Sequence, residues 1–275
     1  MDTLKSTKQK NNGQLRIYRS MKSNWKTQGW GESKACAKTD INGWLKIPTV
    51  IVSKWNNLCP SGFKDFYKLI GMKSHNGTDW ACWQGEPIYF KVDAPCKWWV
   101  RNYTDSDNGQ GIDVFSDRPI DIGDLPDECG ELARKQFEGN YGEPSYGYEK
   151  GKVFVKFRFH HISKSLVSDS QNNVSGKPEG YRECKVKIGD LICLAGNSGA
   201  SSGTHSHESM KIVANNSMTL DSLNGWYGAV DDSRYTENKF VVDLLDDVKE
   251  KALTVIELAR KVIFLTQQFI RSLIK

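Results

Sequence analysis

The stretch Val153-Phe-Val-Lys-Phe-Arg-Phe-His-His-Ile162 is the clearest strand signal in the chain. Apolar and polar residues alternate along it, which is the pattern of a strand with two different faces. The alternation groups the residues Val153, Val155, Phe157, Phe159 and His161 on one face, and Lys156, Arg158 and His160 on the other. We therefore expect His161 to face the core or a cleft, and His160 to lie on the opposite, polar face.

Shorter runs on both sides of this stretch also predict strands, because they are rich in β-branched and aromatic residues and are bounded by turn residues. They are Leu45–Val52, Glu86–Val92, Trp98–Tyr103 and Gly109–Phe115. The run from Val186 to Leu194 predicts two short strands about a Gly189-Asp190 turn. The expected fold is mainly β (α+β overall) and carries a long helix at its C-terminal end.

Three parts of the chain differ in composition. Residues 1–26 hold seven basic residues and one acid, which predicts a flexible segment, with attraction to a polyanion as the alternative. Residues 27–242 form the expected catalytic domain. Residues 116–151 are rich in Asp, Glu, Gly and Pro, and we interpret them as an excursion from the sheet with a short helix between Glu128 and Phe137.

Residues 243–275 predict a long amphipathic helix. Apolar residues recur at alternating spacings of three and four, as in a heptad seam. They are Leu245, Val248, Ala252, Val255, Ala259, Val262, Thr266, Phe269 and Leu273, and Ile256, Ile263 and Ile270 widen the stripe. The helix could pack on its own domain, but so wide an apolar face favours self-association or docking on another surface.

Composition excludes several classes of protein. The hydrophobic share of 38% and the charged share of 26% are typical of globular proteins, and the net charge of +5 comes without a nucleic-acid-binding motif. The seven cysteines contain no Cys-x-x-Cys pair, which argues against a zinc ribbon and suits synthesis in a reducing compartment. We expect no signal peptide and no transmembrane segment. A substrate outside the cytoplasm would then be reached after lysis or export, or from a virion.

The five histidines cluster in three stretches. They are His75, the pair His160 and His161, and the pair His205 and His207. Neutral imidazole is the commonest metal ligand among side chains and titrates near working pH. On a strand, His205 and His207 would face one space while Ser206 and Glu208 point the other way, which argues against Glu208 as the catalytic carboxylate.

The spacing of His75 and Asp79 adds a carboxylate to this set. They lie four residues apart with Gly77 between them, so a helix or a glycine turn could direct both side chains to one point. Two imidazoles and one carboxylate make a three-ligand zinc site with a fourth position open for water. We therefore predict a zinc-dependent hydrolase that uses a metal-activated water, with His75, Asp79 and His207 as ligands. His205 and His161 remain for proton transfer and oxyanion stabilisation.

These motifs resemble the lysostaphin-like zinc metallopeptidases, which cleave peptide bonds in bacterial peptidoglycan. The matching segments are Thr27–Gly31, His75-Asn-Gly-Thr-Asp79, Gly85-Glu-Pro-Ile-Tyr89, Phe159-His-His-Ile-Ser163, Gly189-Asp190, Gly196-Asn-Ser-Gly199, Ser202-Gly203 and His205-Ser-His207. The resemblance covers residues 27–213. It implies an antiparallel β-sheet domain with a groove, Zn²⁺ held by His75, Asp79 and His207, and His161 and His205 as catalytic histidines.

The chain departs from the family pattern at a few positions, which leaves the substrate open. Ser206 stands where the family has Leu, Glu208-Ser209 replaces Phe-Glu, and the excursion at 116–151 is longer than a minimal member needs. The resemblance implies a peptidoglycan endopeptidase, encoded by a phage or a bacterium. The alternatives are an inactive cell-wall-binding or activator module with the same fold, and a structural phage component whose peptidase activity is secondary. Retention of every ligand favours the enzyme.

Overall fold

The computed structural model describes residues 13–32, 67, 72–105, 109–140, 149–167, 182–184, 186–199, 201, 203–213 and 228–273. The strand predicted at residues 45–52 lies outside these ranges.

One large antiparallel sheet organises the domain. Its strand order is β10-β6-β7-β8-β12-β3-β2, with β13 paired to β12. The strands are β2 (Lys26–Gln28), β3 (Thr78–Ala81), β6 (Trp98–Asp105), β7 (Gly109–Ser116), β8 (Phe154–His160), β10 (Arg182–Cys184), β12 (His205–Val213) and β13 (Ala229–Val230). Strand β12 lies between β8 and β3, so it joins the two halves of the sheet.

Two three-stranded sheets complete the β structure of the described residues. One has the order β14-β1-β5, from β14 (Thr236–Phe240), β1 (Arg16–Arg19) and β5 (Val92–Asp93); the other has the order β4-β11-β9, from β4 (Pro87–Tyr89), β11 (Leu191–Leu194) and β9 (Lys164–Ser165). Only β1 and β14 pair in parallel among the described strands. The mainly β, antiparallel fold is thus confirmed.

The segment from Val186 to Leu194 contains one strand rather than the two that we predicted. Residues 186–190 form the turn that leads into β11, with Gly189 at φ +83° and the amide of Asp190 bonded to the carbonyl of Lys187. The side chain of Asp190 also accepts a hydrogen bond from the Lys187 amide at 3.0 Å. These turn bonds use the backbone groups that a first strand would need for pairing.

The two faces of the large sheet have different chemistry. One face packs into the hydrophobic core, where Ile112, Phe157 and Phe159 are at most 1% exposed. On the other face, the carboxylate of Asp113 on β7 is ringed by cations from both neighbouring strands. Its oxygens lie 2.6 Å from Arg101 on β6, and 2.7 Å and 3.2 Å from Arg158 and Lys156 on β8. This polar face continues toward the histidines.

Residues 13–26 are part of the folded domain, so the prediction of a flexible segment over 1–26 is wrong for them. Leu15 and Ile17 are fully buried in the core, and β1 pairs with β5 and β14. The guanidinium of Arg16 donates to the carbonyls of Gly13 and Leu15. Basic residues dominate the composition here, but the alternating apolar residues decide the structure. Residues 1–12 lie outside the described ranges.

The excursion at 116–151 contains α3 (Glu131–Glu138), close to the helix that we predicted between Glu128 and Phe137. Gly139 ends α3 in the left-handed conformation, with its amide bonded to the carbonyl of Gln136. Ile120 and Val153 pair across the base of the excursion. The excursion therefore leaves and rejoins the domain beside the start of β8.

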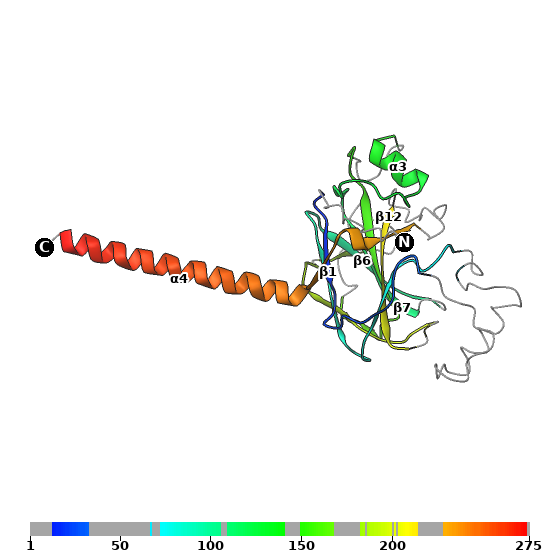
Figure 1. Ribbon diagram of the computed structural model, residues 1–275, viewed down its shortest axis with the longest axis horizontal. Coiled ribbons are helices and arrows are strands. Elements are labelled where there is room, and N and C mark those ends of the chain that lie inside the picture. Colours follow the sequence, from blue (N-terminus) through cyan, green and yellow to red (C-terminus); the bar gives the residue numbers. More distant parts are fainter. Residues whose placement is uncertain are drawn as a thin grey trace, which may run out of the picture.

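A single long helix, α4 (Val241–Leu273), follows β14 and confirms the predicted C-terminal helix. Figure 1 shows it as a rod that projects away from the β domain. Within the described part of the chain, no helix has the length and apolarity needed to cross a membrane.

Candidate metal centre

The loop before β3 carries His75 and lies against the segment that follows β2. The His75 amide donates to the carbonyl of Glu32, and the His75 carbonyl accepts from the amide of Gly31, so the loop is tied to the segment after β2. The imidazole is buried, and its Nδ1 lies 3.1 Å from the carbonyl oxygen of Gly29. Because a carbonyl can only accept, Nδ1 carries the proton and Nε2 keeps a lone pair directed into the site.

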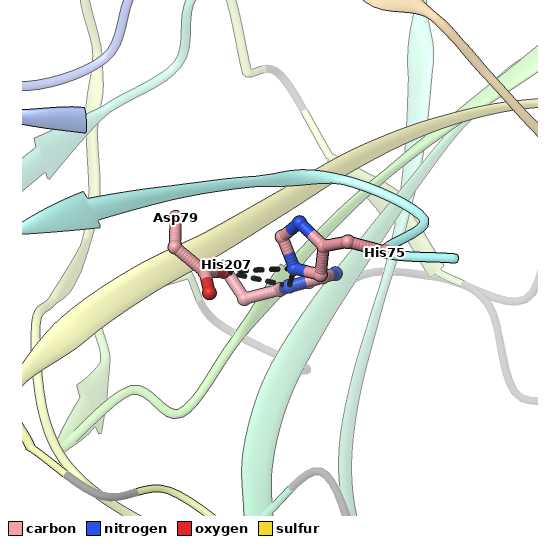
Figure 2. A group of neighbouring side chains, drawn as sticks. All are labelled: His75, Asp79 and His207. Carbon is pink, nitrogen blue, oxygen red and sulfur yellow. Dashed lines mark hydrogen bonds and ion pairs between the residues drawn. The ribbon is translucent and has the colours of Figure 1, made fainter. Parts of the chain in front are cut away.

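Strand register brings Asp79 and His207 together. His207 on β12 lies directly opposite Asp79 on β3, so both side chains leave the same face of the sheet. Figure 2 shows these two side chains and His75 pointing toward one another. The distance from His207 Nδ1 to Asp79 Oδ1 is 2.9 Å, that from His75 Nε2 to His207 Nδ1 is 3.0 Å, and that from His75 Nε2 to Asp79 Oδ1 is 3.2 Å.

The three atoms fit a metal ion. In tetrahedral zinc with bonds of about 2.0–2.1 Å, neighbouring donors lie about 3.3–3.4 Å apart. The observed separations of 2.9–3.2 Å are within a few tenths of an ångström of that spacing. Among the described residues, His75, Asp79 and His207 are the group whose donor atoms converge in this way. The set of two imidazoles and a carboxylate is also one that zinc prefers.

The electrostatics of the cluster favour the ligand forms of its side chains. Burial alone would raise the pKa of Asp79, but the interactions with His207 and His75 outweigh burial and hold the pKa well below its ordinary value. Burial lowers the pKa of His207, although Asp79 opposes the shift. An ionised carboxylate and a neutral imidazole are the forms that bind metal ions.

Gly77 is required by close packing in this motif. A Cβ atom at Gly77 would lie 2.5 Å from the carbonyl oxygen of Glu208 and 2.7 Å from Nε2 of His207. Any larger residue would therefore push directly on β12 and on the His207 ring. The absence of a side chain at Gly77 therefore allows the loop between His75 and Asp79 to pass close to the ring of His207.

His205 and His161 lie side by side next to the cluster. Their ring centroids are 4.7 Å apart, and Nε2 of His205 lies 3.8 Å from Oδ1 of Asp79. Nδ1 of His205 donates to the carbonyl of Gly203 at 2.8 Å, and Nδ1 of His161 donates to the carbonyl of Ser198 at 2.7 Å. As in His75, these bonds leave Nε2 as a proton acceptor.

His161 reaches this position by leaving the strand. Strand β8 ends at His160, and His161 has a left-handed backbone with φ +60°, which is rare for a residue other than glycine. The strand-face argument that separated the adjacent histidines is therefore wrong. His160 pairs with His207 and lies on the site face, while the turn at His161 returns its side chain to the same side.

His160 is a residue of this site that the sequence did not indicate. Its ring centroid lies 5.0 Å from that of His207 in an edge-to-face contact, and its Nδ1 lies 2.6 Å from the hydroxyl of Tyr103. Burial is the largest of the causes that lower the pKa of His160 well below its ordinary value, followed by Arg158. The register between β8 and β12, which places His160 opposite His207, is the feature that could have indicated this residue.

Glu208 points away from the site, as strand alternation predicted. It is 1% exposed, accepts a hydrogen bond from Ser206 Oγ at 3.1 Å and another from the Ser20 hydroxyl, and pairs with Lys91 Nζ at 2.7 Å. Lys91 is also 3.3 Å from Asp232. This buried network anchors β12 on the face opposite the histidines, at the residue that follows His207.

Comparisons with known proteins gave similarity in structure only. No family model matches the chain, and no curated protein matches it. A zinc-containing peptidase from Vibrio cholerae is 16% identical with a TM-score of 0.36, over 82% of this chain and 40% of its own. The catalytic domain of lysostaphin, an antimicrobial peptidase from Staphylococcus simulans, is 18% identical with a TM-score of 0.31, over 58% of this chain and 77% of its own.

The whole lysostaphin chain is 15% identical with a TM-score of 0.36, over 79% of this chain and 52% of its own. The present chain thus spans about two fifths of the Vibrio peptidase and half of lysostaphin. Similarity of this size does not transfer an activity to this chain.

Proposed function

We propose that this chain is a zinc-dependent endopeptidase that hydrolyses peptide bonds in bacterial peptidoglycan. The observation that carries the proposal is the convergence of His75 Nε2, Asp79 Oδ1 and His207 Nδ1 within 3.2 Å of one another, beside two further imidazoles. Two neutral donors and one anion leave a bound Zn²⁺ with a net charge of +1. Such a site keeps its Lewis acidity and an open position for substrate and water.

His75, Asp79 and His207 would hold the ion, and their orientation supports that role. The Gly29 carbonyl fixes the tautomer of His75, and the strand pairing of Asp79 with His207 fixes the other two donors. When bound, Zn²⁺ polarises the carbonyl of the scissile peptide and lowers the pKa of a water to near neutrality. This centre is therefore preorganised for hydrolysis.

His205 and His161 are suited to the proton transfers of amide hydrolysis. Amide cleavage needs an acceptor for the proton of the attacking water and a donor for the leaving nitrogen. Burial, followed by the neighbouring His205, lowers the pKa of His161 to about 4, so that His161 is neutral at pH 7. With Nδ1 bonded to Ser198, its Nε2 can accept a proton or, once protonated, donate a hydrogen bond to the oxyanion.

The substrate class rests on the resemblance between the motifs of this chain and those of lysostaphin-like peptidases. The match includes His75-Asn-Gly-Thr-Asp79 and His205-Ser-His207, together with the glycine and serine residues that precede the second motif. Gly77 has a physical reason to be glycine, which supports treating the first motif as a unit. We therefore infer a peptide of the cell wall as substrate.

The proposal is tested with purified bacterial peptidoglycan. The zinc-loaded chain should lower the turbidity of a cell-wall suspension, and mass spectrometry of the released fragments should show newly formed peptide termini. Removal of the metal with a chelator should abolish this activity, and added Zn²⁺ should restore it. Full activity in His207→Ala would contradict the proposal.

A matched control separates loss of a ligand from general damage. Ser209 lies two residues beyond His207 on the same strand, and its side chain is buried on the same face. Ser209→Ala should keep activity within about threefold, because the change removes one hydroxyl and no ligand. Release of glycan fragments without new peptide termini would indicate a glycosidase and would also contradict the proposal.

A further inference from the structure

Helix α4 contacts the domain only through its first turns in the described structure. Val241 is fully buried with Tyr18 and Phe240. Leu245 packs so closely on Gly189 that a Cβ atom at Gly189 would lie 2.1 Å from Leu245 Cδ1. Beyond these residues the helix leaves the domain (Figure 1).

The projecting part of α4 exposes large aliphatic side chains. The exposed fractions are 63% for Leu253, 64% for Val255, 48% for Ile256, 56% for Leu258, 62% for Val262 and 57% for Ile263. Helical propensity alone seldom keeps an isolated helix folded in water, and most helical stability comes from packing of an apolar face. An apolar surface of this kind marks an interaction site.

The heptad pattern indicates what covers this surface. With Leu245 in position a, Ala252 and Ala259 also occupy a, and Val255 and Val262 occupy d. Ile256 and Ile263 then fall at e, and Leu258 falls at g. In two-stranded coiled coils, e and g are usually charged because they lie at the rim of a narrow a/d seam. Apolar e and g positions widen the stripe, so that one partner helix cannot cover it.

The polar face of α4 argues for protein partners over a lipid surface. Near its start the helix carries Asp246 and Asp247 together with Lys249 and Lys251, and Lys249 pairs with Asp246 at 3.2 Å. Helices that lie on anionic membranes carry mainly Lys and Arg on the polar face. A heptad with mixed charges is matched by another helix with the same repeat, and a second copy supplies one.

We propose that the chain self-associates through α4 into a bundle of at least three copies, with residues 252–263 at its centre. Small Ala252 and Ala259 let the helices approach closely, while Val255 and Val262 fill the seam between them. The isoleucines at e and the leucine at g become buried against the two neighbouring helices.

Light scattering coupled to gel filtration tests the proposal on the full chain. Wild-type protein should have a mass at least three times the 31.1 kDa of one chain. Val255→Asp should shift the mass to that of the monomer, because it places a charge in the seam. Thr254→Asp introduces the same charge at the adjacent exposed position c, and it should leave the mass unchanged. A monomeric wild type, or an unchanged mass in Val255→Asp, would overturn the proposal.

A second variant tests the number of copies. The double variant Ile256→Lys and Ile263→Lys places lysine at two e positions, as Lys249 already does in the preceding heptad. The assembly should fall to two copies or one, and a wild-type dimer would overturn the proposal. Unfolding of the domain at the same temperature in all variants shows that only association has changed. A wild-type monomer that co-sediments with phosphatidylglycerol vesicles would mean that a membrane covers the helix instead.

Discussion

The histidines of this chain differ in the nitrogen atom that each presents. His75, His161 and His205 give their Nδ1 protons to backbone carbonyls and present Nε2, whereas His207 presents Nδ1 to the centre. Hydrogen bonds to the backbone fix both the tautomer and the ring orientation before any metal binds. At the scale of single residues, the site is thus defined by carbonyl groups as much as by the side chains that they orient.

Gly77→Ala should weaken zinc binding even though it changes no ligand. The new Cβ atom would lie 2.7 Å from His207 Nε2, so the ring or the strand must move. We expect a loss of about 10- to 100-fold in zinc affinity, similar to the loss of an orienting group. Competition titration with a chromophoric chelator measures it. Gly203→Ala is the control, because its Cβ would have no neighbour within 4 Å, and comparable losses in both variants would contradict this explanation.

His161→Ala should lower turnover by about 10²- to 10⁴-fold, which is the usual contribution of a general acid or base. Zinc should remain bound, because His161 is not among the converging donors. His160→Ala should cost about tenfold, through looser packing against the His207 ring. Turnover and zinc content measured on the same preparations separate the two roles. Loss of zinc in His161→Ala would show that it acts as a ligand.

At the scale of elements, β12 connects the candidate metal centre to the core. One face carries His205 and His207, and the other carries Ser206 and Glu208. Sequence alternation alone predicted this division, because β12 is regular and its period of two holds throughout. The same reasoning failed at His161, where one left-handed residue breaks the period. Such a break has no signature in composition or spacing.

Lys91→Met should destabilise the domain by about 3–5 kcal/mol, since it leaves buried carboxylates without their cation. Burial alone would lower the pKa of Lys91, but Glu208 and Asp232 outweigh it and raise the pKa, so the ammonium is charged in the folded state. Urea unfolding measures the free energy. Lys187→Met, at an exposed turn, is the control and should change it by less than about 0.5 kcal/mol. Equal stability of the two variants would show that the network contributes nothing.

The free energy of unfolding should decrease at acidic pH, because the Asp113 carboxylate stabilises the folded domain only while it is ionised. Burial alone would raise the pKa of its carboxyl, but Lys156, Arg158 and Arg101 outweigh burial and hold the pKa well below its ordinary value. A depressed folded-state pKa gives stability that is present above the unfolded pKa of about 3.9 and is lost as the pH falls through and below it.

Thermal unfolding between pH 7 and pH 3 measures this effect. Asp113→Asn should be less stable than wild type at pH 7, and its unfolding temperature should depend less on pH in the acid range. Asp127→Asn, at an exposed position, should keep the wild-type dependence. A parallel pH profile for Asp113→Asn and wild type would contradict a dominant role for this carboxylate.

At the scale of the whole molecule, the periodic spacing of apolar residues predicted the structure better than amino-acid composition did. Strand β8 and helix α4 followed from periods of two and of three to four residues, whereas the antiparallel pairing of the sheet was expected only from the family resemblance. The basic composition of residues 1–26 pointed to a flexible segment, yet the apolar residues Leu15 and Ile17 insert that segment into the core. Pairing between strands distant in sequence, such as β1 with β14, depends on tertiary packing that no local pattern specifies.

The metal site is tested by the zinc content of the purified chain after dialysis against a small excess of Zn²⁺, measured by plasma mass spectrometry. The convergence of His75, Asp79 and His207 predicts about one zinc ion per chain in the wild type. Asp79→Asn and His207→Ala should each lose it, while Asp190→Asn, on the turn before β11, should keep it. Wild-type protein without zinc, or full occupancy in His207→Ala, would contradict the assignment of these three residues as zinc ligands.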